Sequence, residues 1–215
     1  MGSTVISEAD SLVVLERSDI ILAHESVADE VLKLLAARLE GRAAASHLDA
    51  PNGYRGLFTE ASATRLSGII ADALNKGGKL AIGKPDPVQG NIVQPTVIEA
   101  TDSSMRIYHE EMFGPVMSLR RFSTTEEAIK LANASEYGLA ASVYGADEKE
   151  CWAVARRIDA GQGHINGPTV HDEQTVPHGG LKKSGFGRFN GIEGLKEFSV
   201  TKTITVNVPH DKYPS

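Results

Sequence analysis

The sequence predicts an α/β fold in which a largely parallel sheet is flanked by helices. Two observations lead to this prediction. Short apolar runs of strand length alternate with longer stretches in which apolar residues recur every three or four positions. Residues that begin and end helices stand between these segments. Repeated strand–helix alternation is typical of sheets whose faces are covered by helices.

The N-terminal quarter predicts two strands and a helix. Residues 12–15 and 20–23 are apolar runs of strand length. A helix follows from Ser26, because Asp29 stands three residues later in a capping position. Gly41 ends this helix. Its apolar stripe consists of Val27, Val31, Leu35 and Leu39.

The next segment predicts a helix and a strand. Residues 43–55 are polar or small and predict a loop, and residues 60–75 predict an amphipathic helix. The apolar face of this helix consists of Leu66, Ile69, Ile70, Ala73 and Leu74. Two glycines then stop the helix, residues 80–82 predict a buried strand, and residues 85–87 (Pro-Asp-Pro) predict a turn.

Strands and helices continue to alternate in the middle of the chain. Residues 93–99 and 117–122 predict extended segments. Thr124 and Glu127 have the spacing of a capping box, so a helix is expected from there to about Asn133. These three elements extend the α/β pattern.

The later segments are shorter. Residues 139–144 predict a strand, Asp147 begins a helix that closes at 158–161, and residues 164–166 predict a short strand. A glycine-rich loop follows, and it contains Gly179, Gly180, Gly185, Gly187, Gly191 and Gly194. Their spacing differs from that of the dinucleotide-binding fingerprint, so this loop is not interpreted as a phosphate site.

The C-terminal segment predicts a half-buried strand. Over residues 200–208, Val200, Ile204, Val206 and Val208 alternate with polar residues, and Lys202 is the one break on the apolar side. We therefore expect residues 1–208 to form a single domain whose terminal strand spans about 200–208. Residues 209–215 are expected to be a frayed tail.

Composition excludes several classes of function. The chain has 215 residues, a formal net charge of −6 and no long run of lysine and arginine, which argues against nucleic acid and anionic membranes as partners. No apolar run approaches the length of a membrane span, and the first residues match no secretory signal. Cys151 is the single cysteine, so no internal disulfide can form. A cytoplasmic protein is expected.

Two segments carry a resemblance to a known family. The first is His109-Glu110-Glu111-Met112-Phe113-Gly114-Pro115-Val116, and the second runs from Asn166 through Pro177–Arg188 to Leu195. Both resemble hallmark blocks of the aldehyde dehydrogenase superfamily, in the right order and at plausible spacing. Residues 164–173 (His-Ile-Asn-Gly-Pro-Thr-Val-His-Asp-Glu) are most similar to the branch that acts on salicylaldehyde, benzaldehyde and vanillin. Residues 20–208 match the C-terminal, catalytic part of such enzymes.

The resemblance implies a site and an assembly. In the family, the residues that match Glu111 and Phe113 contact the ribose and nicotinamide of the cofactor. The substrate pocket implied here consists of Asn166, Thr169, Phe113 and His178. From the residues alone, the favoured interpretation is that Glu110 and Glu111 are solvated charges and Phe113 is a core residue. The strand matching 200–208 pairs with a partner subunit in the family, so a homodimer is expected, or a mixed oligomer with a full-length relative.

Three parts of the family's dehydrogenase are not found in this sequence. They are the Rossmann-type domain that holds most of NAD, the glutamate of a Glu-Leu-Gly-Gly block, and the nucleophilic cysteine. Without gaps, the cysteine position falls at about Leu15; alternatively, a deletion between Asp10 and about Arg17 has removed it. No cofactor is therefore expected, and NAD(P) binding is not expected either.

Ionisable groups near the glycine loop are the candidates for any remaining chemistry. His178 stands where many relatives have an aromatic residue. It is either a candidate general acid or base, or a structural residue that forms a hydrogen bond with a loop carbonyl. His171, Asp172 and Glu173 are further candidate catalytic residues. Their spacing fits no compact zinc pattern, so no metal is expected. Cys151 lies among Glu148 and Glu150, which disfavour its thiolate.

Three hypotheses follow from the sequence, and they leave open whether the chain is an enzyme. In the first, the chain binds a small aromatic or carbonyl compound and catalyses a redox-neutral isomerisation, cyclisation or dehydration in a specialised pathway. In the second, it is a non-catalytic scaffold that pairs with a full-length relative. In the third, residual NAD-linked aldehyde oxidation occurs with a half supplied by another chain.

Overall fold

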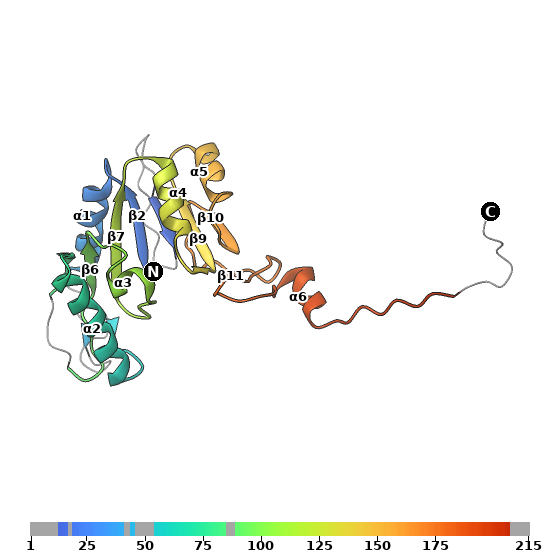
Figure 1. Ribbon diagram of the computed structural model, residues 1–215, viewed down its shortest axis with the longest axis horizontal. Helices are drawn as coiled ribbons and strands as arrows, with labels where there is room; N and C mark the ends of the chain where they lie inside the picture. Colours follow the sequence, from blue (N-terminus) through green and yellow to red (C-terminus); the bar gives the residue numbers. More distant parts are fainter. Residues whose placement is uncertain (1–12, 17–18, 41–43, 46–53, 85–88, 207–215) are drawn as a thin grey trace.

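A seven-stranded sheet forms the centre of the protein (Figure 1). The computed structural model describes residues 13–16, 19–40, 44–45, 54–84 and 89–206. In spatial order the strands are β10 (Gln162–Ile165), β9 (Ala140–Tyr144), β1 (Val13–Glu16), β2 (Ile20–His24), β7 (Val116–Phe122), β6 (Thr96–Glu99) and β5 (Lys79–Ile82). Two small sheets pair β3 (Ala44–Ala45) with β4 (Tyr54–Arg55) and β8 (Tyr137–Gly138) with β11 (Leu181–Lys182). The α/β class is confirmed.

The sheet is mixed in direction, which differs from the largely parallel sheet expected. The pairs β2/β7, β6/β7 and β9/β10 are parallel, whereas β1/β2, β1/β9 and β5/β6 are antiparallel. The link from β1 to β2 contains only residues 17–19. Because a parallel pair needs a long crossover, a link of this length forces β1 to run against β2.

Six helices are found in the described part of the chain. They are α1 (Ala28–Leu39), α2 (Glu60–Asn75), α3 (Arg106–His109), α4 (Thr125–Asn133), α5 (Glu148–Ala155) and α6 (Gly191–Glu197). The bounds of α2 and the capping box of α4 are confirmed: Glu127 N donates to Thr124 Oγ1 at 3.3 Å, and Ser123 N donates to Glu127 Oε2 at 2.9 Å. Neither α3 nor α6 was expected.

Two helix boundaries were predicted wrongly. Helix α1 begins at Ala28 without a side-chain cap, because the Ser26 hydroxyl instead lies 2.7 Å from His24 Nδ1. Helix α5 ends at Ala155, several residues before the expected stop at 158–161. Its N-terminal cap is as expected, with the Asp147 carboxylate accepting from Lys149 N at 2.8 Å.

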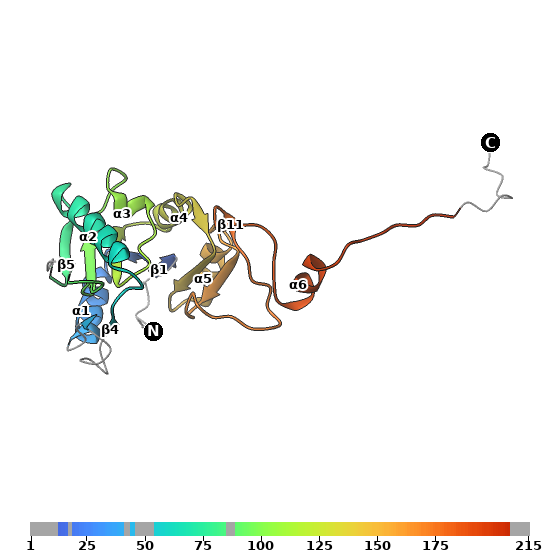
Figure 2. The same ribbon diagram turned by 90° about the horizontal axis from the view of Figure 1, so that it is seen from below.

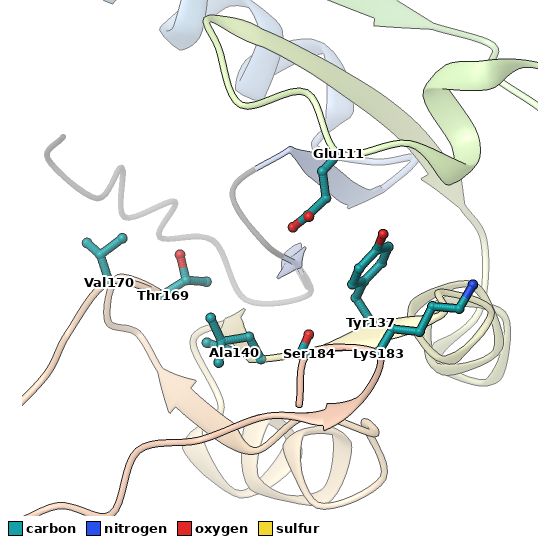
Figure 3. A pocket seen from close by; sticks show the side chains of 8 residues that line it. Glu111, Tyr137, Ala140, Thr169, Val170, Lys183 and Ser184 are labelled. Carbon is teal, nitrogen blue, oxygen red and sulfur yellow. The ribbon is translucent and has the colours of Figure 1, made fainter. Parts of the chain in front are cut away.

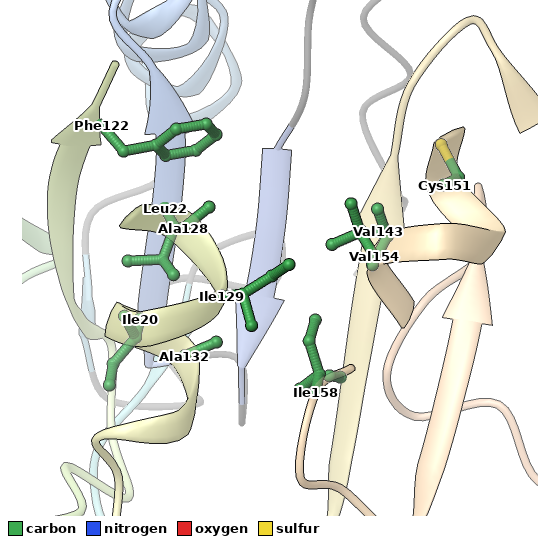
Figure 4. Close-up of a cluster of buried hydrophobic side chains, with 11 residues drawn as sticks. Ile20, Leu22, Phe122, Ala128, Ile129, Ala132, Val143, Cys151, Val154 and Ile158 are labelled. Atoms are coloured by element: carbon green, nitrogen blue, oxygen red, sulfur yellow. The ribbon is translucent and has the colours of Figure 1, made fainter. Parts of the chain in front are cut away.

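Apolar residues cover both faces of the sheet. On one face, α4 and α5 pack on β2 and β9 through a cluster that includes Leu22, Ile129, Val143 and Val154 (Figure 4). Helix α2 packs through Leu66 against Ile98 and Val116 on the same face. Helix α1 covers the opposite face, where it packs against Ile21, Ala23, Val97 and Leu119 (Figure 2). The fold is therefore a helix–sheet–helix sandwich.

Strand β5 is an edge strand, not the buried strand expected at 80–82. Its residues alternate between exposed and partly buried positions. The pairing of β5 with β6 shifts register between Leu80 and Ile82. The expected turn at 85–87 lies outside the described residues, as do residues 4–10 and the tail 209–215.

The C-terminal segment extends away from the body of the protein (Figures 1 and 2). Residues 201–206 form no strand, and Val200, Ile204 and Val206 are 96%, 75% and 83% exposed. The expectation of a half-buried strand is not met in this chain, because these residues pair with no sheet edge within the described part. Residues 207–208 lie outside that part.

Candidate functional site

The segment between α3 and β7 is held rigidly by the rest of the fold. Arg65 on α2 donates from Nη1 to the carbonyl oxygen of Glu111 at 3.0 Å and from Nη2 to that of Met112 at 2.8 Å. Met112 N donates to Asp19 Oδ2 at 3.2 Å, and the Met112 side chain is 1% exposed. The backbone at Glu111 and Met112 is therefore fixed by α2 and by the residue preceding β2.

Phe113 has a strained backbone and an exposed ring. Its φ is +47°, a left-handed conformation that bulky residues rarely adopt, and its side chain is 77% exposed. Gly114 is required next to it, because a Cβ there would lie 2.6 Å from Leu66 Cδ2. Strain of this kind persists only where surrounding contacts enforce it, and such residues are concentrated at functional sites. The prediction of Phe113 as a core residue is wrong.

The loop after β10 carries the second part of the site. Asn166 Oδ1 accepts from Gly145 N and Asn166 Nδ2 donates to Gly145 O, both at 3.0 Å. The Tyr144 hydroxyl donates to the carbonyl oxygen of Gly167 at 2.7 Å. These bonds fix the start of the loop and place Thr169 beside the sheet.

A hollow of about 390 Å³ lies between these two segments (Figure 3). Its lining consists of Glu111, Tyr137, Leu139, Ala140, Thr169, Val170, Lys183 and Ser184. Glu111 comes from the segment before β7, and Thr169 and Val170 come from the loop after β10. The remaining residues come from β8, β9 and the segment beside β11, so the hollow joins parts of the chain that are far apart in sequence.

Polar contacts fix part of the wall. The Ser184 hydroxyl accepts from Gly138 N at 3.0 Å, and Lys183 Nζ donates to Glu136 Oε2 at 2.7 Å. The hydrogen bond and the charge of Glu136 raise the pKa of Lys183. The hollow therefore combines an aromatic ring and aliphatic side chains with a carboxylate, a hydroxyl and a cationic amine.

The structure brings together some of the expected site residues. Glu111 and Thr169 line the hollow, whereas Phe113, Asn166 and His178 are not among its lining residues. Sequence reasoning missed Tyr137, Leu139, Ala140, Val170, Lys183 and Ser184. Lys183 and Ser184 lie inside the glycine-rich block, so their place in that block was an available signal. Tyr137, Leu139 and Ala140 carried none.

The candidate catalytic histidines form two pairs with acidic residues. His171 Nε2 lies 2.9 Å from Glu173 Oε1, with both side chains about half exposed. His178 Nδ1 lies 4.0 Å from Asp172 Oδ1, and the His178 ring packs at 4.7 Å from that of Phe189. No group of three or more His, Cys, Asp or Glu residues with the geometry of a metal site is found within the described ranges.

Cys151 lies away from the hollow. It is fully buried on α5, among the residues of the α4–α5 core. Burial raises the pKa of the Cys151 thiol, and the charges of Glu150 and Asp147 raise it further. A buried, protonated thiol is a poor nucleophile.

The fold and the two segments that build the hollow define a class of protein. The aldehyde dehydrogenase family model matches residues 17–204, and the chain belongs to this family. No helix in the described part has the length and apolar character needed to cross a membrane.

Particular relatives act, by their names, on aromatic aldehydes. The chain is 40% identical to vanillin dehydrogenase from Pseudomonas fluorescens over 195 aligned residues, and the alignment covers 90% of this chain and 40% of the relative. It is 39% identical to salicylaldehyde dehydrogenase from Pseudomonas putida over 153 aligned residues, and that alignment covers 71% of this chain and 31% of the relative. The structure is also similar to the crystal structure of a salicylaldehyde dehydrogenase from Pseudomonas putida G7 complexed with salicylaldehyde. The TM-score is 0.82 and the sequence identity is 33%, and the match covers 92% of this chain and 40% of that chain. The chain thus spans about 40% of the length of such relatives.

Proposed function

We propose that this chain binds a small aromatic aldehyde, or a related carbonyl compound, in the hollow beside Glu111 and Thr169. The observation that supports this proposal is that the hollow joins the two family-like segments, each held by its own hydrogen bonds. The named relatives act on vanillin and salicylaldehyde, which are small aromatic aldehydes.

The chemistry of the lining suits such a ligand. A volume of about 390 Å³ is within the usual range for small-molecule sites. Tyr137, Leu139 and Val170 offer apolar surface to an aromatic ring, and Lys183 and Ser184 offer hydrogen bonds to a carbonyl or phenolic oxygen. Glu111 on the other side accepts a hydrogen bond from a hydroxyl group.

For the bound compound we propose a redox-neutral reaction, such as isomerisation, cyclisation or dehydration. His178 is the candidate general acid or base, with His171, Asp172 and Glu173 as further candidates. His178 Nδ1 is buried and makes no hydrogen bond within the described part of the chain. An imidazole nitrogen without a hydrogen-bond partner is able to accept or donate a proton.

NAD-linked oxidation is a separate hypothesis, and it concerns Glu111 and Phe113. A carboxylate accepts hydrogen bonds from two ribose hydroxyls, and the exposed Phe113 ring offers a flat apolar surface. These two residues fit the nicotinamide-ribose end of a dinucleotide. The adenine and phosphate end would need a second unit, so we expect NAD and NADP to stabilise this chain little.

Thermal shift with a matched pair of variants tests the proposal. Saturation at about a hundredfold over the dissociation constant adds about 2.7 kcal/mol, which raises Tm by about 5–10 °C in a protein of this size. We expect such a shift with salicylaldehyde, vanillin or benzaldehyde, and little with NAD or NADP. Val170→Trp should fill the hollow and abolish the shift, whereas Val176→Trp, outside the lining of the hollow, should preserve it. An equal aldehyde shift in both variants would contradict the proposal.

A second candidate function is assembly through the C-terminal segment. Phe198, Val200, Ile204 and Val206 are 75–96% exposed on an extended segment, a pattern that pairs readily with another chain. We propose a homodimer, or a mixed oligomer with a full-length relative in which this chain is a non-catalytic scaffold. Light scattering on the wild type and on Ile204→Asp tests this, because the charge should dissociate the oligomer. A wild-type chain that is monomeric, and that does not co-purify with a larger relative, would contradict it.

A further inference from the structure

His164 lies on a sheet face that the loop after β10 covers. In the parallel pair of β10 and β9, the register partner of His164 is Ser142. Ala141 and Val143 point into the α4–α5 core, so Ser142 and His164 face the opposite side. His171 and His178, both in the segment after β10, lie near His164 on this side, and we call these three residues the histidine cluster.

The cluster connects the loop to the sheet. The rings of His164 and His171 meet edge to face with centroids 5.9 Å apart. At the end of the loop, Gln162 Nε2 on β10 donates to the carbonyl oxygen of Pro177 at 3.5 Å. The start and end of the loop are thus fixed by hydrogen bonds, whereas residues 168–176 contact β10 through the His171–His164 ring pair.

Several buried polar atoms around the cluster make no hydrogen bond with any part of the described chain. They are Ser142 Oγ, Gln162 Oε1, His164 Nε2 and His178 Nδ1. Buried polar groups in native proteins are almost always partnered, so a group of unpartnered atoms from two strands and a loop is unusual. Among the described residues, His164 Nε2 has no hydrogen-bond acceptor that would stabilise a positive charge on the ring.

The nearby carboxylates interact with other groups. Glu173 lies 2.9 Å from His171 Nε2, and Asp172 accepts from Asn190 Nδ2 at 2.8 Å and lies 4.0 Å from His178 Nδ1. On β9, Ser142 is uncharged and the Tyr144 hydroxyl donates to Gly167 O. Within the described part of the chain, no carboxylate forms an ion pair with His164.

Burial lowers the pKa of His164, and positive charge on His171 and His178 lowers it further. The closed loop therefore favours neutral His164, whereas an open loop would return the ring to water. Above the ordinary imidazole pKa of about 6.5 the ring is neutral in both states, and pH has no effect. As the pH falls below that value, the open state takes up the proton first, so the closed loop loses stability.

We propose that the histidine cluster is an acid-sensitive contact that releases residues 168–176 from β10 when His164 is protonated. Thr169 and Val170 belong to this segment and line the hollow, so release removes one wall of it. The effect on ligand binding rests on the proposed function; the release itself does not.

Amide hydrogen exchange on the full chain tests the release. The readout is the protection of amides at 168–176, such as His171 N, which donates to Pro168 O, and Val176 N, which donates to Glu173 O. After correction for intrinsic rates, wild-type protection should fall by up to about tenfold per pH unit below about 6.5, as linkage to one proton requires. His164→Asn should make the protection independent of pH. His109→Asn, which changes an exposed histidine near Ser103, should behave as wild type.

The outcomes are distinct. Constant protection in the wild type from pH 7.5 to 5.5, or an unchanged pH dependence in His164→Asn, would overturn the inference. If His164→Asn fails to fold, the His164 ring signal in wild-type NMR spectra serves instead: it should titrate together with loop opening, and separate titration would overturn it. A further measurement is the dissociation constant of vanillin at pH 7.5 and at pH 5.5. A loop that opens while affinity stays constant supports the release and contradicts the proposed function.

Discussion

Replacing Arg65 by Met should loosen the segment that carries Glu111 and Phe113 without removing any residue that lines the hollow. The change removes two hydrogen bonds from a charged donor to the carbonyl oxygens of Glu111 and Met112, 3.0 and 2.8 Å long. It keeps most of the aliphatic stem. Each such bond contributes about 1.5–3 kcal/mol when buried. Because the Arg65 side chain is 38% exposed, we expect about 2–3 kcal/mol in total for the pair.

A second effect should be local. The strained φ of Phe113 (+47°) is stable only while the flanking backbone is fixed, so loss of Arg65 lets this residue relax. Urea unfolding should show the loss of about 2–3 kcal/mol, and Tm should fall by about 5–10 °C. Aldehyde titration at a temperature where the variant is folded should show weaker binding.

Arg156→Met is the matched control. Arg156 is exposed at the C-terminal end of α5, so its replacement should change stability by less than about 0.5 kcal/mol. If Arg65→Met unfolds at the wild-type urea concentration and binds aldehyde normally, the idea that α2 positions the Glu111 segment is wrong.

Three further predictions concern stability and reactivity. Leu66→Ala, at a fully buried side chain, should cost about 2–5 kcal/mol in urea unfolding, whereas Leu195→Ala, at a 66% exposed one, should cost under about 0.5 kcal/mol. The hydrogen bond from Arg106 lowers the pKa of Glu110. This carboxylate therefore stabilises the fold above its ordinary pKa, and the contribution is lost as the pH falls toward the lowered pKa. Glu110→Gln should flatten the acid limb of a curve of unfolding free energy against pH, and an unchanged limb would refute this. Cys151 should react with iodoacetamide only on unfolding, and fast labelling of the folded chain would show that α5 opens.

Local signals predicted the helices well where a cap and an apolar stripe agreed. Thr124 accepts the backbone hydrogen bond expected of a cap, and α4 begins directly after it. Thr59 caps α2 in the same way, although it was not predicted as a cap. Ser26 had the same local signal as Thr124, but the nearby His24 ring competes for its hydroxyl. A cap can therefore be read from sequence only when no tertiary partner takes the side chain.

Strand direction and the site depended on information that is not local. The apolar run at residues 80–82 predicted a strand, but only the position of β5 at the end of the sheet makes it exposed. In the hollow, Glu111 and Thr169 belong to segments that resemble the family, so they were predicted. Tyr137 and Ala140 line it because β8 and β9 lie between those segments in space, and no spacing in the sequence encodes that.

Strand β1, in the interior of the large sheet, determines whether the sheet is continuous. In the order β10-β9-β1-β2-β7-β6-β5, strand β1 alone joins the two-stranded part to the four-stranded part. A version of the chain that starts after residue 16 would leave β2 and β9 with facing edges whose N–H and C=O groups have no strand between them. Such edges recruit strands from other molecules, so N-terminal trimming of this protein is expected to cause aggregation more readily than trimming of its C-terminal segment.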